Sequence, residues 1–181
     1  MLSPVSVRRA GVSLTLCCTL LVGVTACNDD DKDSAATPSG TSSAEKQKFA
    51  KTRFVANAGL AAGATYQWIV KPFRAGKFKS GADGRKFALV KAGLAGAFTY
   101  NRLKAATKNA QGDPTLAKAV APLTAGIDAL KDLPSKLRKG DSTDSIVDSF
   151  DGVINSVKDA GKSAGAEVKD KVPSAGELAK G

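Results

Sequence analysis

The thiols are the most reactive side chains of this sequence, and all of them lie near the N-terminus. Cys17, Cys18 and Cys27 are the only cysteines, and histidine is absent. The chain after Cys27 therefore has no disulfide framework, lacks the usual ligands of structural zinc, and lacks the usual general base at neutral pH. We accordingly expect no metal, no cofactor and no catalysis, since a catalytic triad here would need lysine as its base.

The segment before Cys27 is organised like an export signal. Residues 1–10 carry Arg8 and Arg9 without an acidic residue, and residues 12–24 are uncharged and rich in Leu and Val. A basic start, an apolar core and small residues at the end are typical of a secretory signal peptide. The alternative is an uncleaved transmembrane helix, which needs about 20 predominantly apolar residues. This stretch is shorter than that and is diluted by serine and threonine.

The end of that segment, Val24-Thr25-Ala26-Cys27, resembles the bacterial lipobox, in which an aliphatic residue and two small residues precede cysteine. The resemblance implies that a diacylglyceryl group is attached to the Cys27 sulfur and that a signal peptidase cuts between Ala26 and Cys27. Two or more acyl chains hold a protein stably at a bilayer, whereas one is marginal. The expected location is the cell membrane, with the protein lipid-anchored on its extracytoplasmic face.

Composition divides the rest of the chain. Residues 28–41 are polar, with an aspartate-rich start, and cannot bury enough apolar surface to fold. We expect a signal peptide at 1–26, the lipidated Cys27 with a disordered linker at 27–41, a helical domain at 42–160, and a flexible tail at 161–181. The tail is assigned from its content of glycine, alanine, lysine and serine.

Basic and aromatic residues alternate between positions 68 and 86. The basic residues are Lys71, Arg74, Lys77, Lys79, Arg85 and Lys86, and the aromatic residues are Trp68, Phe73 and Phe78. Basic residues near an anionic lipid surface contribute about 1 kcal/mol each, and aromatic rings favour the interface. We expect this segment to bind anionic lipid or a cell-wall polymer. An anionic small ligand or protein is a second interpretation, and a solvated surface with its rings turned into the core is a third.

The wider charge distribution supports a basic face. Between residues 46 and 108 there are 14 Lys or Arg residues and a single acidic residue, Asp83. The same pattern suits nucleic acid, but an exported protein rarely meets nucleic acid, so we do not expect that partner. The sequence identifies no protein partner.

Helical signals predict the elements that position this segment. Ser42 and Glu45 fit a capping box at the start of a helix that runs towards Val70 and is ended or kinked by Pro72. A second helix is expected over about 83–109. The apolar residues expected at helical spacing along it are Phe87, Val90, Leu94 and Phe98.

Two further helices follow. Asp113 should cap a third helix with Pro114 at its first position, kinked at Pro122 and broken at Pro134. Asp141 or Ser142 should cap a fourth. Its apolar stripe is expected to be Ile146, Val147, Phe150, Val153, Ile154 and Val157. Short connections between amphipathic helices predict an all-α, up-down bundle of about four helices.

A short internal echo links the first two helices. Residues 58–66 resemble residues 92–100 at an offset of 34 positions, and small residues recur four apart at Gly59 and Gly63 and at Gly93 and Ala97. Such spacing lets backbones approach closely. We expect the first two helices to pack along these small residues, unless the echo reflects only the alanine-rich composition.

The lipobox and the Ala/Gly/Lys-rich composition look like those of actinobacterial lipoproteins. Residues 54–100, with Ala-Gly-Leu-Ala twice and Lys-Pro-Phe-Arg-Ala-Gly once, are similar to a group of uncharacterised secreted proteins of such organisms. This resemblance implies a location and no site residues. We expect a membrane-anchored binding or scaffolding domain with a basic face. The alternatives are a ligand-binding protein with a pocket between helices and an unrecognised envelope enzyme.

Overall fold

The computed structural model describes residues 42–180. The predicted signal peptide, its cleavage site at Ala26 and Cys27, and the predicted linker lie outside these residues. Every regular element of the described part is helical, which confirms the all-α prediction. About six helices pack against one another. Within residues 42–180, no helix has the length and apolar character needed to cross a bilayer.

The first helix begins as the sequence predicts. In α1 (Ser43–Thr65), the Glu45 amide donates to Ser42 Oγ at 3.2 Å, and the Ser42 amide donates to the Glu45 carboxylate at 3.1 Å. The capping box therefore forms in full. The helix continues without a break through a π-helical turn, η1 (Tyr66–Val70), into α2 (Lys71–Arg74).

The π turn stands directly before Pro72. A proline inside a helix lacks the amide hydrogen and its ring crowds the carbonyl four residues earlier, which here belongs to Trp68. A wider turn separates these groups, so the helix passes through Pro72 and ends after Arg74. The helix does reach Val70 as predicted, but Pro72 alters the winding and does not stop it.

The second predicted helix is α3 (Arg85–Ala110). The third is divided into α4 (Pro114–Val120), a 3-10 turn η2 (Ala121–Leu123), α5 (Thr124–Ala129) and α6 (Leu133–Lys139). Asp113 caps α4 as predicted, since its carboxylate accepts a hydrogen bond from the Leu116 amide at 2.8 Å. Pro122 lies in the 3-10 turn and Pro134 in the first turn of α6, so both prolines interrupt this stretch.

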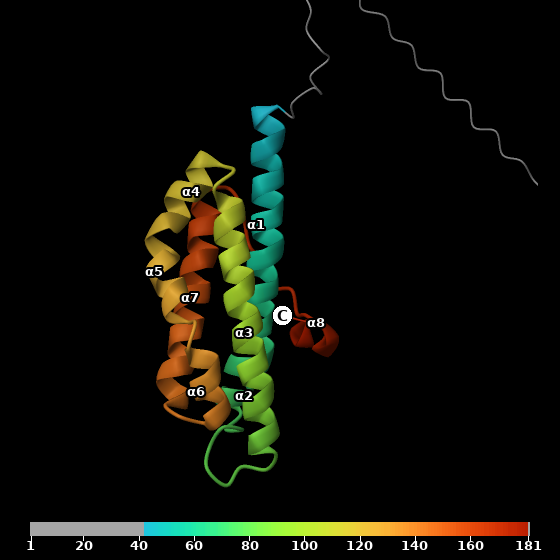
Figure 1. Ribbon diagram of the computed structural model, residues 1–181, viewed down its shortest axis with the longest axis vertical. Helices are drawn as coiled ribbons and strands as arrows, with labels where there is room; N and C mark the ends of the chain where they lie inside the picture. The colour runs from blue at the N-terminus through green and yellow to red at the C-terminus, as the bar shows by residue number, and fades with distance from the viewer. Residues whose placement is uncertain (1–41, 181) are drawn as a thin grey trace, which may run out of the picture. The chain divides into compact units, whose positions relative to one another are not determined.

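The last long helix, α7 (Thr143–Ser163), buries five of the six residues of the predicted apolar stripe, with Phe150 fully buried, and the sixth, Val153, is half-buried. Ser142 precedes it with a positive φ of 46°, but its side chain makes no capping hydrogen bond. Figure 1 shows α1 and α3 as a long antiparallel hairpin, with α4, α5 and α6 descending beside it and α7 returning between them. The core lies between this hairpin and α7, where Phe54, Phe98 and Phe150 are fully buried.

The C-terminal segment differs from the prediction of a flexible tail. After α7 the chain turns at Gly165 and runs back along α1, where the Lys171 amide donates to the Gly59 carbonyl at 2.9 Å. Ala166 and Val168 are buried, and a short helix, α8 (Ala175–Ala179), follows with Leu178 buried. Small residues lead this segment onto α1, so it belongs to the packed unit.

Candidate functional site

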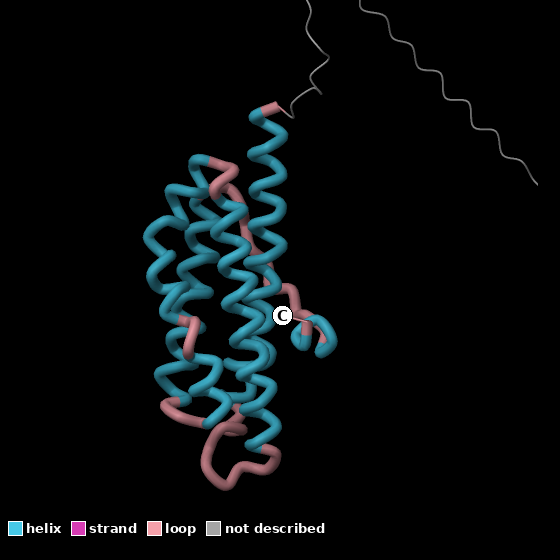
Figure 2. Tube along the Cα trace, viewed as in Figure 1, coloured by secondary structure: helices cyan, strands magenta, loops and turns pink. Residues whose placement is uncertain are grey.

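The predicted basic residues gather at one end of the α1–α3 hairpin. We call this end, residues 66–91, the tip; it comprises the π turn, α2, the connecting loop and the start of α3 (Figure 2). It holds one acidic residue, Asp83. Its basic residues are Lys71, Arg74, Lys77, Lys79, Arg85, Lys86 and Lys91. None of them takes part in the three ion pairs of residues 42–180, so the described part does not neutralise their charge locally.

All three predicted aromatic residues pack against the core, with Phe78 buried and Trp68 and Phe73 half-buried. Phe78 is buried, and Phe73 packs against the core with its ring centroid 6.2 Å from that of Phe78, the two planes tilted by 49°. Phe78 is therefore not available to a partner surface, which corrects its assignment as a contact residue and agrees with the interpretation that rings of this segment turn into the core. The physical reason is that this pair secures a loop that has little other apolar content.

The Arg85 side chain is fixed by a hydrogen bond to the loop between α2 and α3. Its Nε donates to the Phe78 carbonyl at 2.8 Å. A Cβ placed on Gly140 would lie 2.5 Å from the Arg85 guanidinium, so the loop before α7 closes tightly over this side chain. Gly140 has a φ of 82°, a left-handed conformation that favours glycine. We therefore assign Arg85 mainly to positioning the tip.

A groove of about 410 Å³ lies between the π turn and the start of α3, and we call it the Trp68 groove. The Lys91 ammonium lies 5.0 Å from the Trp68 ring centroid and 4.3 Å from that of Phe87, in the geometry of cation–π contacts. Lys71 and Lys77 also line the groove. An apolar floor with cations at its rim suits a ligand that joins an apolar or aromatic part to an anionic group.

Two residues of this groove, Phe87 and Lys91, were missed as site residues by sequence reasoning. The sequence places Phe87 in an apolar series with Val90, Leu94 and Phe98. Only Phe98 of that series is buried, and Phe87 is 65% exposed. The i, i+4 spacing of Phe87 and Lys91 on one helix is the signal that could have identified the pair.

A second hollow, of about 440 Å³, lies on another side of the tip. Arg74, Lys79 and Arg85 line it together with Thr143 and Asp144 at the start of α7. The predicted basic residues are thus shared between two surfaces, and Lys86 is exposed and lines neither. The structure brings these residues to one end of the α1–α3 hairpin, but they do not line a single shared site.

Within residues 42–180, no group of three or more His, Cys, Asp or Glu side chains is arranged to hold a metal ion. The Trp68 indole Nε1 is buried and has no hydrogen-bond partner in the same part of the chain. This donor is covered, so it is not a contact point for a ligand in the groove.

No protein-family model, curated protein or solved structure matches this chain.

Proposed function

We propose that this protein is a lipid-anchored, extracytoplasmic binding protein whose basic tip contacts an anionic component of the cell envelope. The anchor is the acylated Cys27, as the lipobox resemblance implies. The observation that carries the binding role is the tip itself, which has seven basic residues and one acidic residue, and none of whose cations takes part in the three ion pairs of residues 42–180.

The length of the hairpin favours a polymer over the lipid surface as the partner of the tip. At about 1.5 Å per residue, the continuous helix from Ser43 to Arg74 is about 48 Å long. The tip lies at its far end from Ser42, the end nearest to Cys27 in the sequence. Residues 28–41 span at most about 50 Å when fully extended, so bringing the tip to the anchoring membrane would consume nearly all of that length.

An anionic wall polymer therefore fits the tip better. Such a polymer presents many phosphate or carboxylate groups, and the spread of Lys71, Lys77 and Lys79 over the tip suits repeated weak contacts. Binding of this kind is screened by salt, because these cations are exposed to solvent.

The Trp68 groove favours a second candidate function, the binding of a small amphipathic anion. Its volume of about 410 Å³ lies within the usual range for ligand sites. Trp68 is the only tryptophan of the chain, so its fluorescence would report occupancy directly. A polymer and a small ligand are distinguished by whether the emission of Trp68 changes on binding.

The test is binding of the mature protein to polyphosphate and to polyglutamate at low and high salt. We expect salt-dependent binding that falls at least tenfold in the variant K71Q/R74Q/K77Q/K79Q. The matched control, K118Q/K131Q/K162Q/K180Q, removes the same charge from exposed sites outside the tip and should change affinity less than about threefold, through net charge alone. Equal losses of affinity in the tip variant and the control would contradict the proposal, because they would show that net charge alone attracts the polymer.

A further inference from the structure

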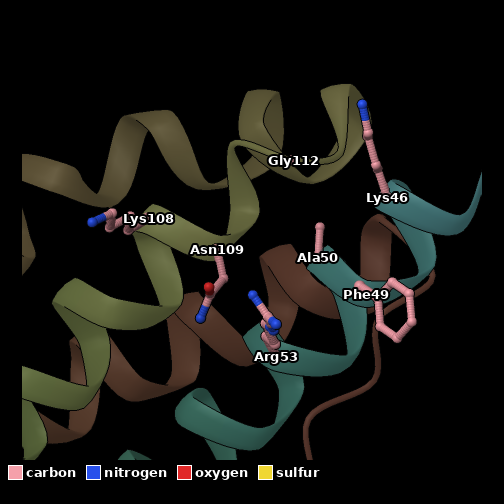
Figure 3. A pocket seen from close by; sticks show the side chains of 7 residues that line it. All are labelled: Lys46, Phe49, Ala50, Arg53, Lys108, Asn109 and Gly112. Atoms are coloured by element: carbon pink, nitrogen blue, oxygen red, sulfur yellow. The ribbon is translucent and has the colours of Figure 1, made fainter. Parts of the chain in front are cut away.

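The opposite end of the α1–α3 hairpin carries a second basic surface, which the sequence did not single out. A hollow of about 510 Å³ lies between the first turns of α1 and the last turns of α3 (Figure 3). It is lined by Lys46, Phe49, Ala50, Arg53, Lys108, Asn109 and Gly112. We call it the N-terminal surface, because α1 begins beside it.

Its side chains are arranged as a spread surface around one exposed ring. Figure 3 shows Arg53 and Asn109 pointing toward each other, with the ammonium groups of Lys46 and Lys108 at separate edges. Phe49 is 57% exposed and its ring points away from the helix pair. In the described part of the chain, none of the three cations is in an ion pair.

An exposed ring beside unpaired cations suits a membrane interface. An aromatic ring is stabilised at the level of the headgroups, and each nearby basic residue contributes about 1 kcal/mol on an anionic bilayer. A single bound phosphate would require the cations to converge, and Lys46 and Lys108 do not converge with Arg53. The separated cations fit an array of headgroups better.

The place of this surface in the chain supports the same occupant. Lys46 lies four positions after Ser42, and only residues 28–41 separate Ser42 from Cys27. Of the two basic ends of the hairpin, this one follows the anchor more closely along the chain, since the 23 residues of α1, about 34 Å at about 1.5 Å each, lead from it towards the tip.

We propose that the N-terminal surface rests on the anionic headgroups of the membrane that holds the anchor, with the Phe49 ring in the interface. This inference rests on the proposed lipid anchor. It means that the bundle stands on the membrane by its N-terminal end and directs the basic tip away from the bilayer.

The test places the only tryptophan at position 49. The lipidated F49W/W68F variant is inserted into vesicles of phosphatidylcholine alone, or with one quarter phosphatidylglycerol, each containing brominated lipid. Since the acyl chains hold the protein on both vesicles, quenching of the emission reports contact at position 49 and not anchoring. We expect the F49W/W68F variant to be quenched at least twofold more strongly on vesicles with phosphatidylglycerol. Adding K46Q/R53Q/K108Q to the same background should abolish this difference, and adding the control set K118Q/K131Q/K162Q should leave it in place.

Three results would overturn the inference. One is equal quenching on both vesicles. A second is an emission shift with inorganic phosphate or soluble glycerol phosphate in place of lipid, which would assign the surface to a free anion. A third is a phosphatidylglycerol effect that appears only after Asp29, Asp30, Asp31 and Asp33 are replaced by Asn, which would make that acidic run the occupant. The intact mass of the protein from its native host is measured before the vesicle experiment. An unacylated Cys27 would refute the proposed function, and this outcome is distinct from a failure of the inference about the N-terminal surface.

Discussion

Thr65 of α1 and Thr99 of α3 share a buried hydrogen bond, with their hydroxyl oxygens 3.1 Å apart. The two residues occupy equivalent positions in the internal echo, 34 residues apart. The echo therefore places matching residues face to face where the two antiparallel helices meet. The Thr99 hydroxyl also lies 3.4 Å from the Ala61 carbonyl, so it can donate there while accepting from Thr65.

This arrangement predicts unequal effects of removing the two hydroxyls. T99V leaves the buried Thr65 hydroxyl without its partner and should lower the free energy of unfolding by about 1–3 kcal/mol. T65V leaves Thr99 its contact with Ala61 and should cost about 0.5–1.5 kcal/mol. The double variant should cost less than the sum of the two. Urea unfolding of the four proteins measures this, and additive or reversed values would contradict the account.

Gly63 predicts a different kind of loss, because it faces the C-terminal segment. A Cβ on Gly63 would overlap the Lys171 backbone, so G63A should displace residues 166–172 and destabilise the protein by about 1–3 kcal/mol. G152A in α7 is the matched control, since its Cβ meets nothing within 4 Å. Alanine there should stabilise by about 0.5–1 kcal/mol. Hydrogen exchange of residues 166–172 should rise in G63A only, and unchanged exchange would refute this role.

Lys91 predicts a measurable cation–π contribution at the tip. K91M keeps most of the side-chain stem but removes the charge over Trp68 and Phe87, and should cost about 0.5–1 kcal/mol of unfolding free energy. K86M is the control on the same helix, an exposed lysine whose replacement should change stability by less than about 0.5 kcal/mol. Thermal unfolding compares them. Equal effects would show that the Lys91 contact is not stabilising.

The cap of α8 predicts a local pH dependence. Hydrogen bonds from the backbone and side chain of Ser174 hold the pKa of Glu177 below its ordinary value of 4.5. A lowered carboxylate pKa contributes stability that is present above the unfolded value and is lost as pH falls through the folded value. We expect amide protection in α8 to decrease below about pH 4.5. In E177Q, whose amide can still complete the box, this decrease should be absent. A decrease of the same size in E177Q would assign the effect elsewhere.

Local signals in the sequence predicted the starts of α1 and α4 and the apolar face of α7, but not α8, which lies in the predicted flexible tail. The capping box at Ser42 and Glu45, the Asp113 cap and the apolar stripe of α7 act within a few residues of one another, so their physics is visible in the sequence. The small residues spaced four apart in the first two helices correctly predicted close backbone approach, but the segments that approach the glycines are not the ones expected. Gly59 and Gly63 approach the backbone of residues 169–172, and Gly93 approaches α6, because a small residue shows only that something comes close.

The candidate site was only partly predictable for a related reason. Charge runs locate Lys71, Lys77 and Lys79 because surface cations need no tertiary partner. Whether a ring faces the core depends on the other elements, so the sequence left the direction of the Phe78 ring open, and it did not show that Phe87 is exposed. The fold of residues 164–174 against α1 was likewise hidden, because its contacts are made mainly by backbone and small side chains.

The location of the protein and the direction of its two basic ends all depend on one covalent modification. The most direct measurement is the intact mass, with fragmentation of the N-terminal peptide, of the protein purified from the membrane fraction of its native host. The account predicts a chain that begins at Cys27 and carries acyl groups, and a C27A variant that is neither acylated nor retained in that fraction. A chain that still begins at Met1, with the Cys27 thiol unmodified, would contradict it.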